Sequence, residues 1–306
     1  MKNGLLGQSL LAVLTSLLFA GSFVAGKYTT GEMGPLLITL LRYIIASLFL
    51  QLLVWQQQRQ QQTTHQAFSQ SSFRDKVCFF LLGTFGVMGY HFFFFSSLRY
   101  TAVANSAIIN AFNPVITGLL AAILLREKLA TQNYLGGAIA ILGVLILLTD
   151  GNPDRLLARQ FNYGDLLMLC AVFCWAGYSI LLRSLGKRYS GLAMSYYGAL
   201  FGVAQLTVFV IPELAKTGWP TLSLPAALGV LYMGIGASGI GYLLFTLSTQ
   251  RIGPTKSTSI VYSGVPVWVA LLAWLFFGEP ITPWMVVSMA FILLGLRTVL
   301  QPRQPS

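Results

Sequence analysis

Polar side chains within long apolar runs are the first candidates for chemistry in this sequence. One such run carries Ser106, Asn110, Asn113 and Thr117 at spacings of 4, 3 and 4 residues. In a helix this spacing places all four side chains on one face. Polar groups inside a bilayer are costly and normally face a cavity, although Ser, Thr and Asn also join neighbouring helices by hydrogen bonds. We expect Asn110 at a cavity and interpret the hydroxyl groups as links between helices.

His91 is the only histidine within an apolar run, and it follows Tyr90 and precedes the phenylalanine run Phe92–Phe95. Because imidazole ionises near neutral pH, such a histidine can accept a proton or contact a substrate. A structural histidine, hydrogen-bonded in the core, explains it equally well. Tyr90 and Tyr242 are expected at the same cavity as Asn110.

Aromatic side chains complete the candidate site. Trp175 lies near the middle of its run, away from the membrane interfaces where tryptophan usually acts as an anchor. With Phe94, Tyr178 and Tyr262 it could line an aromatic cavity for a planar or amphipathic substrate, and packing alone accounts for these rings equally well. The candidate substrate-binding residues are Tyr90, His91, Phe94, Asn110, Trp175, Tyr178, Tyr242 and Tyr262.

Charged side chains lie mostly at the ends of the apolar runs. Glu127 and Glu279 stand at turns, which favours structural or gating roles over contact with a substrate. Arg42 is about seven residues into its run, roughly 10 Å at 1.5 Å per residue, and snorkelling to the surface is open to it. No acidic residue falls in mid-run, so a carboxylate proton relay is not supported. Facilitated diffusion, exchange and coupling through His91 stay open.

The sequence contains none of the familiar catalytic sets. It has no His/Glu metal motif, no Ser–His–Asp candidate and no phosphate-binding loop. Cys170 and Cys174 share a helical face but have no further soft ligand, so we interpret them, with Cys78, as buried inert thiols. We therefore expect no catalytic residue, no metal site and no cofactor.

The composition indicates the elements that must position these residues. The 306 residues are 56% hydrophobic and 9% charged, whereas soluble domains carry roughly 25% charged residues. The net charge of +11 does not indicate nucleic-acid binding, because the basic residues come singly between apolar runs rather than in one patch. The partner that this composition predicts is the lipid bilayer.

Ten runs approach the roughly 20 apolar residues that a helix needs to cross a bilayer. The first has no convincing cleavage site and is interpreted as a permanent helix. The expected spans are Gln8–Gly26, Pro35–Trp55, Val77–Leu98, Ala102–Leu125, Tyr134–Leu148, Gly164–Leu182, Leu192–Ile211, Ala226–Leu247, Ser257–Phe277 and Pro283–Leu300. With the N-terminus inside, 13 of the 19 basic residues lie at cytoplasmic ends, which favours both termini in the cytoplasm.

The sequence repeats itself. A shift of 156 residues places Phe19 on Trp175 and Lys27 on Arg183. A shift of 152 residues superposes a longer series: Tyr90 on Tyr242, Phe93 on Phe245, Arg99 on Arg251, Pro114 on Pro266, Glu127 on Glu279 and Gly143 on Gly295. So many matches in order indicate two related halves, residues 1–150 and 151–306.

Each half holds five spans, an odd number, so the second half must enter the membrane with the opposite polarity. The expected fold is an all-α membrane protein of ten transmembrane helices in two inverted five-helix repeats. Inverted repeats are typical of secondary transporters, in which two similar halves alternate around a site near the midplane. Duplication that merely builds a larger bundle is the alternative.

These features resemble the drug/metabolite transporter superfamily and, within it, the EamA-type family of ten-helix carriers. The residues that carry the resemblance are Pro35, Arg42, Asn113, Pro114, Glu127, Gly136, Trp175, Ala176, Pro266, Gly278, Glu279 and Gly295. The first half departs from the pattern at Arg126, where a glycine is expected before the glutamate. The resemblance implies structural or gating roles for Arg42, Pro114, Glu127, Pro266 and Glu279, and export of amino acids and other metabolites across a bacterial inner membrane.

We therefore expect a secondary transporter that exports small metabolites, such as amino acids, across the cytoplasmic membrane by alternating access. An intramembrane enzyme and a non-transporting scaffold or channel are the alternatives. A pore would be expected to show a ring or filter motif, which is absent from the sequence. The small pair Gly198 and Gly202 could serve packing within one chain or in a homodimer. No nucleic-acid partner is expected.

Overall fold

The computed structural model describes residues 2–59, 68–125, 131–152, 154, 161–186, 188–252 and 254–300. Within these ranges every regular element is helical. In chain order the elements are α1 (Lys2–Thr30), α2 (Pro35–Arg59), η1 (Phe68–Gln70), α3 (Phe73–Leu82), η2 (Gly83–Gly89), α4 (Tyr90–Tyr100), α5 (Val103–Asn110), α6 (Asn113–Leu125), α7 (Thr131–Thr149), α9 (Tyr163–Leu185), α10 (Gly191–Thr217), α11 (Leu224–Leu231), η3 (Tyr232–Gly241), α12 (Tyr242–Ile252), α13 (Pro254–Phe277) and α14 (Pro283–Leu300).

The all-α, ten-helix fold class is confirmed. In the part of the chain that the structure describes, eight segments are long and apolar enough to cross a membrane, and two shorter apolar helices lie at Tyr134–Thr149 and Pro283–Val299. Two of the long spans contain π-helical segments: η2 joins α3 to α4, and η3 joins α11 to α12. A third span is broken between α5 and α6, and each of these irregular places adjoins the cavity described below.

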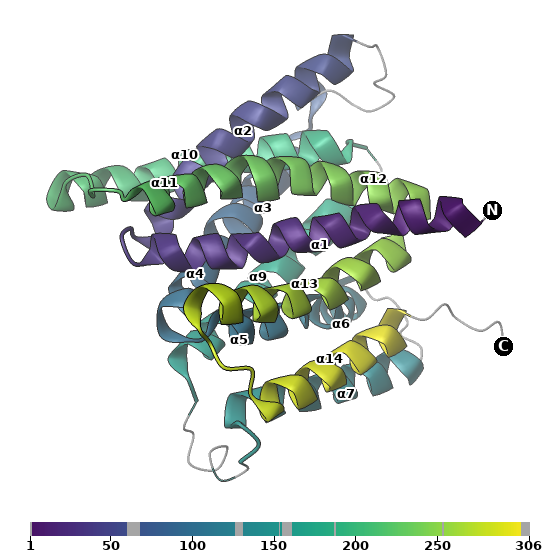
Figure 1. Ribbon diagram of the computed structural model, residues 1–306. Helices are drawn as coiled ribbons and strands as arrows, with labels where there is room; N and C mark the ends of the chain where they lie inside the picture. The colour runs from purple at the N-terminus through teal and green to yellow at the C-terminus, as the bar shows by residue number, and fades with distance from the viewer. Residues whose placement is uncertain are drawn as a thin grey trace.

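The helices form one bundle in which α1 has a central position (Figure 1). It packs against α13, η3, α12 and α4, while α10 packs against α2 and η2. The pair α7 and α14 lies together at one edge, and α1 begins at the same end of the bundle at which α14 finishes (Figure 1). This layout leaves the central helices to shape the interior.

Helix boundaries follow from capping residues. Four helices begin with a residue whose side-chain oxygen accepts a hydrogen bond from a free backbone N–H group of the first turn. These residues are Ser72 for α3, Asn162 for α9, Ser190 for α10 and Ser223 for α11. Each cap satisfies a donor that the helix itself cannot. Gly218 and Gly278 have positive φ angles of 76° and 64° directly after α10 and α13, a conformation that favours glycine at helix ends.

The cysteines differ from the expectation in one respect. Cys170 is exposed on α9, whereas Cys78 and Cys174 are half-buried. The expectation of a buried thiol was wrong for Cys170, because its side of α9 faces outward from the bundle. In a membrane-spanning helix an apolar outer face meets lipid, so hydrophobic surroundings do not imply burial inside the protein.

Glycines let α7 and α14 approach closely. A Cβ atom on Gly136 would lie 2.7 Å from the carbonyl oxygen of Gly295, and one on Gly295 would lie 2.5 Å from that of Gly136. Farther along the same two helices, Ser288 Oγ donates a hydrogen bond of 2.7 Å to the carbonyl of Gly143. Small residues commonly permit such contact between membrane helices, so the apposed glycines hold these two helices together.

We expect Gly136→Ala and Gly295→Ala each to lower the stability of the purified protein in detergent. The added methyl group would meet backbone atoms that cannot rotate away, and such overpacking typically costs about 1–3 kcal/mol. The midpoint of thermal unfolding, followed by size-exclusion chromatography after heating, measures the effect.

Gly118→Ala is the matched control, because a Cβ atom there has nothing within 4 Å. Since alanine favours helix over glycine by about 0.8–1 kcal/mol, this variant should be neutral or slightly stabilised. Equal midpoints for all three variants would contradict the proposed role of the apposed glycines.

Candidate functional site

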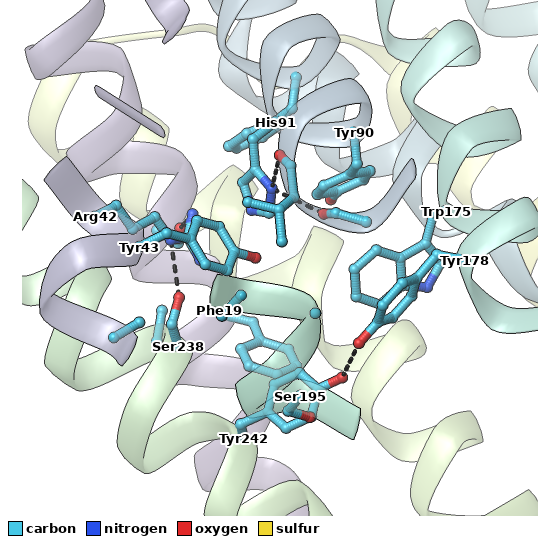
Figure 2. Close-up of a pocket in the computed structure, with 18 of the residues that line it drawn as sticks. Phe19, Arg42, Tyr43, Tyr90, His91, Trp175, Tyr178, Ser195, Ser238 and Tyr242 are labelled. Atoms are coloured by element: carbon cyan, nitrogen blue, oxygen red, sulfur yellow. Dashed lines mark hydrogen bonds between the residues drawn. The ribbon is translucent and has the colours of Figure 1, made fainter. Parts of the chain in front are cut away.

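A cavity of about 120 Å³ lies between the central helices (Figure 2). One water molecule needs roughly 10–15 Å³ of such space, so the cavity has room for a small organic molecule. All eight predicted substrate-binding residues line it: Tyr90, His91, Phe94, Asn110, Trp175, Tyr178, Tyr242 and Tyr262. The structure thus gathers residues from α4, α5, α9, α12 and α13 around one space.

Several lining residues were not among the predicted ones. These include Phe19, Ser22, Tyr43, Ser195 and Ser238. The internal repeat carried a usable signal for two of them, because a shift of 156 residues places Phe19 on Trp175 and Ser22 on Tyr178. Ser238 stands four residues before Tyr242 in the same apolar run, a spacing that places both on one helical face. Tyr43 and Ser195 had no distinguishing mark in the sequence.

The π-helical segment η2 positions His91. Nδ1 of its ring lies 3.2 Å from the carbonyl oxygen of Gly86 and 3.1 Å from that of Val87. Carbonyl oxygens only accept, so Nδ1 carries the proton and Nε2 of the neutral ring is left as an acceptor. The ring meets those of Tyr43 and Tyr90 edge-on, with centroids 5.0 and 4.8 Å away. Nδ1 therefore has a structural role, and a substrate contact through Nε2 stays a prediction.

Asn110 is the centre of a buried polar cluster. Its Oδ1 accepts a hydrogen bond of 3.1 Å from the Tyr90 hydroxyl and one of 2.6 Å from Nδ2 of Asn113. Ser106, from the same predicted face, pairs with Ser97 of α4 at 3.0 Å. The predicted polar face therefore divides as expected for these residues: Asn110 reaches the cavity, and the Ser106 hydroxyl links two helices.

Pro114 explains the break between α5 and α6. Proline has no N–H group, so position 114 cannot donate to the carbonyl oxygen of Asn110 four residues earlier. Accordingly α5 ends at Asn110 and α6 begins at Asn113, directly beside the cavity. Pro266 is buried within α13, which continues from Pro254 to Phe277 without interruption. A structural effect is thus visible at Pro114, and gating by either proline stays a prediction.

Aromatic rings form the wall of the cavity across from Arg42 (Figure 2). The Trp175 ring lies 4.9 Å from that of Tyr90 and 5.1 Å from that of Tyr178. The hydroxyl groups of Tyr178 and Tyr242 are 3.1 Å apart. The Tyr178 ring packs directly on Gly86, where a Cβ atom would lie 2.3 Å from it. This wall is apolar in its ring faces and neutral in its few polar atoms.

Arg42 lines the cavity from α2 with only 7% of its surface exposed. Its Nε donates to Ser238 Oγ at 2.9 Å, and one terminal nitrogen donates to Ser22 Oγ at 3.1 Å. The guanidinium carbon lies 5.9 Å from the centre of the Tyr43 ring. The side chain therefore points into the bundle, and the snorkelling left open for it does not occur.

Glu279 holds the beginning of α5. Its carboxylate oxygens accept hydrogen bonds from the backbone N–H of Val103 at 2.9 and 3.1 Å, and a longer one of 3.4 Å from that of Ala104. A negative charge at a helix N-terminus is favoured by the free N–H groups and the helix dipole. The hydrogen bonds of Glu279 tie it to the start of α5, and its structural or gating role stays a prediction. Glu127 lies outside the described residues.

Further polar ties lie at this end of the bundle, where α1 finishes and α5 begins. The Glu32 carboxylate accepts bonds from the hydroxyl (2.5 Å) and backbone N–H (2.8 Å) of Ser223, which lower the pKa of the Glu32 carboxyl. Arg99 donates to the carbonyls of Thr30 and Met33 at 3.1 and 2.6 Å. At the opposite end a terminal nitrogen of Arg188 lies 2.7 Å from the carboxylate of Asp75, which ties the start of α3 to the connection between α9 and α10.

The fold and the cavity together define a multi-pass helical membrane protein with a binding-sized space at its centre. The model of the EamA-like transporter family matches residues 7–149 and 162–301. The chain therefore belongs to the EamA-like transporter family and is a membrane transporter. The resemblance stated from the sequence is confirmed.

Individual relatives agree with the family. The chain is 27% identical over 285 residues to the uncharacterized transporter YyaM of Bacillus subtilis (strain 168), covering 92% of this chain and 90% of that one. It is 25% identical over 228 residues to a probable terminal-alkyne amino-acid exporter of Streptantibioticus cattleyicolor, covering 74% and 73%. A crystal structure superposes with a TM-score of 0.61 at 20% identity, covering 96% and 98%, and this likeness concerns the fold.

We expect Glu279→Gln to lower the thermal unfolding midpoint in detergent. The amide removes the charge that interacts with the N-terminus of α5, and hydrogen bonds to charged groups contribute about 1.5–3 kcal/mol. Glu213→Gln is the control, since Glu213 is an exposed glutamate on α10 and its replacement should change stability by less than about 0.5 kcal/mol. Indistinguishable midpoints for the two variants would show that Glu279 does not hold α5.

Proposed function

We propose that this transporter exports small organic metabolites across the cytoplasmic membrane by alternating access between two inverted five-helix halves, residues 1–150 and 151–306. The observation that carries the proposal is the cavity itself, which takes its lining from both halves. Equivalent positions meet there: Tyr90 and Tyr242 through a shift of 152 residues, and Phe19 and Trp175 through a shift of 156. Alternating carriers place their substrate site at such an interface between repeats.

Repeated local structure supports the relation between the halves. The hydroxyl pairs Ser97–Ser106 and Ser248–Ser257 both lie at 3.0 Å, and the second pair follows the first by 151 residues. The two π-helical segments each end directly before a cavity tyrosine, Tyr90 or Tyr242. A shared ancestral unit would produce these agreements, whereas unrelated halves would have to reach each of them separately.

The position of the cavity supports loading from the cytoplasm. Ser195 lines the cavity yet stands only four residues into α10, about 6 Å along the helix axis. That end of the bundle also holds the start of α1, which the Lys/Arg bias places in the cytoplasm. The opposite end carries the ties of Glu32 to Ser223 and of Glu279 to α5. An arrangement of this kind favours uptake of cytoplasmic substrate and its later release outside.

Amino acids are the substrates we propose first. The relative from Streptantibioticus cattleyicolor is named as a probable exporter of an amino acid, and the cavity offers both polar groups and aromatic faces. A carrier moves its solute unmodified, whereas an enzyme would change the solute's chemistry. Purified protein in liposomes loaded with labelled amino acids distinguishes the two: chemically intact solute should appear outside, and recovery of a converted product would refute transport as the activity.

We expect Trp175→Ala and His91→Gln each to reduce flux in this assay by about tenfold or more while protein yield stays near normal. Loss of a cavity contact needs to weaken the bound state by only about 1.4 kcal/mol to do so. Trp274→Ala is the matched control, because Trp274 is 60% exposed on α13 and does not line the cavity. Wild-type flux in the two cavity variants would remove those residues from the site.

Inverted halves require equivalent positions to face opposite sides of the membrane. Ser72 and Ser223 cap α3 and α11, are both exposed, and stand 151 residues apart. In a background without the three native cysteines, Ser72→Cys should react with a membrane-impermeant maleimide only from the cytoplasmic side, and Ser223→Cys only from outside. Labelling of both from the same side of intact cells would contradict the inverted arrangement.

A further inference from the structure

We propose that the substrate carries a carboxylate group, which binds to Arg42, and an apolar, planar body that lies toward Trp175 and Tyr178. This inference rests on the proposed transport function and makes its substrate class specific. It takes Arg42 beyond the structural or gating role expected from the family resemblance, to direct contact with the transported molecule.

The first argument is charge. A guanidinium group stays protonated at any physiological pH, and burying an isolated charge is costly unless it is paired. Arg42 is almost fully buried, and none of the described residues that line the cavity beside it is an aspartate or glutamate. Its two bonds go to neutral serine hydroxyls, which accept hydrogen bonds but do not balance the charge. An anionic ligand would supply the counter-charge that the lining residues lack.

The second argument is geometry. Ser22 reaches Arg42 from α1 and Ser238 reaches it from η3, at 3.1 and 2.9 Å. Two bonds from different helices fix the plane of the guanidinium, so little further order is lost when a ligand binds. They occupy two of the five N–H donors that arginine carries. A carboxylate can accept two parallel bonds from such a group, which is the strong bidentate arrangement.

The third argument is the asymmetry of the cavity. Arg42 is related to Gly198 by the shift of 156 residues, so the second half places no charge at the equivalent position. In Figure 2, Arg42 and Ser238 lie on one side and Trp175 and Tyr178 on the other. A ligand with one anionic end and one apolar end therefore has a single preferred orientation across this space.

The amino group of an amino acid would meet only neutral groups among the described lining residues, such as the tyrosine hydroxyls, since Oδ1 of Asn110 already accepts two hydrogen bonds. The structure thus requires the carboxylate and is permissive about the amino group. Amino acids and the corresponding 2-oxo acids share the required chemistry, and the experiment separates the two sources.

The test compares four probes with the same ring on purified full-length protein: L-phenylalanine, phenylpyruvate, L-phenylalanine methyl ester and 2-phenylethylamine. Ligands that bind the folded state raise its stability by RT ln(1 + L/Kd), where L is the free ligand concentration, so titrations of the thermal midpoint give relative dissociation constants. We expect at least one of the two carboxylates to bind about 10- to 100-fold more tightly than the ester and the amine, as a charge-assisted contact implies. Tighter binding of L-phenylalanine would indicate an amino acid as the substrate, and tighter binding of phenylpyruvate would indicate a 2-oxo acid.

Variants separate binding from helix packing. Arg42→Gln should abolish the difference between acid and ester, and Arg42→Lys should keep part of it. The double variant Ser22→Ala, Ser238→Ala removes the bonds that orient Arg42 and leaves the charge, so it should weaken binding of the acid and keep a smaller preference for the acid over the ester. If Arg42 merely joined helices, the double variant would resemble Arg42→Gln, and both would lower stability without changing the ratio of acid to ester.

Two results would overturn the proposal. One is equal binding of acid, ester and amine by the wild-type protein, a comparison that needs no variant to fold. The other is stabilisation by neither carboxylate. In both cases the liposome assay separates the causes: flux of a neutral or cationic solute would leave the carrier function intact and remove only the carboxylate contact, whereas absence of any flux would remove the carrier function itself.

Discussion

Backbone hydrogen bonding within the membrane is the constraint on which this structure depends. Hydrocarbon offers no partner for an N–H or C=O group, so a spanning segment must satisfy its own backbone, which the α-helix does. The described spans depart from regular α-helix at η2, at η3 and between α5 and α6. All three departures border the cavity, where side chains can take over the missing bonds.

The chemistry of the cavity follows from these departures. In η2 the carbonyls of Gly86 and Val87 face the His91 side chain, which donates to them. At the α5–α6 break Asn110 collects two donors, and in η3 Ser238 accepts from Arg42. Irregular backbone in a π-helical segment often marks a functional site. In η2 the histidine that could contact a ligand thus also satisfies two backbone carbonyls, whereas the contacts of Asn110 and Ser238 join side chains at the other two departures.

The sequence was sufficient for the fold and for much of the cavity lining. The ten spans could be predicted because each is apolar for nearly its full length, and the eight predicted lining residues because large or polar side chains are conspicuous within such runs. Tyr43 and Ser195 escaped, since their runs contain similar residues and only helix packing decides which face inward. Tertiary context likewise decided that Arg42 turns inward and that Cys170 turns outward, since neither run shows a polar stripe that would orient it.

The π-helical segments were also beyond prediction. Glycine-rich stretches such as Gly234–Gly241 are compatible with a turn, a kink or close helix contact, and only the neighbouring helices select among these. In the structure, a Cβ atom on Gly234 would lie 2.7 Å from the side chain of Ile45, and one on Gly239 would lie 2.8 Å from the Phe49 ring. The approach of α2 thus selects the conformation, and the approach depends on residues about 190 positions away in the sequence.

The two halves share their scaffold and differ in their chemistry. The serine pairs, the tyrosines after each π-helical segment and the glycine that is Gly143 in one half and Gly295 in the other recur in both, whereas Arg42, His91 and Asn110 occur in the first half and are replaced by Gly198, Leu243 and Tyr262 in the second. Alternation, as proposed here, needs similar mechanics in the two halves, because each must adopt the conformation of the other. Recognition carries no such requirement, since a ligand near the interface contacts both halves at once. Duplication followed by divergence of the lining residues would therefore preserve the motion and let the two halves supply different contacts to what is carried.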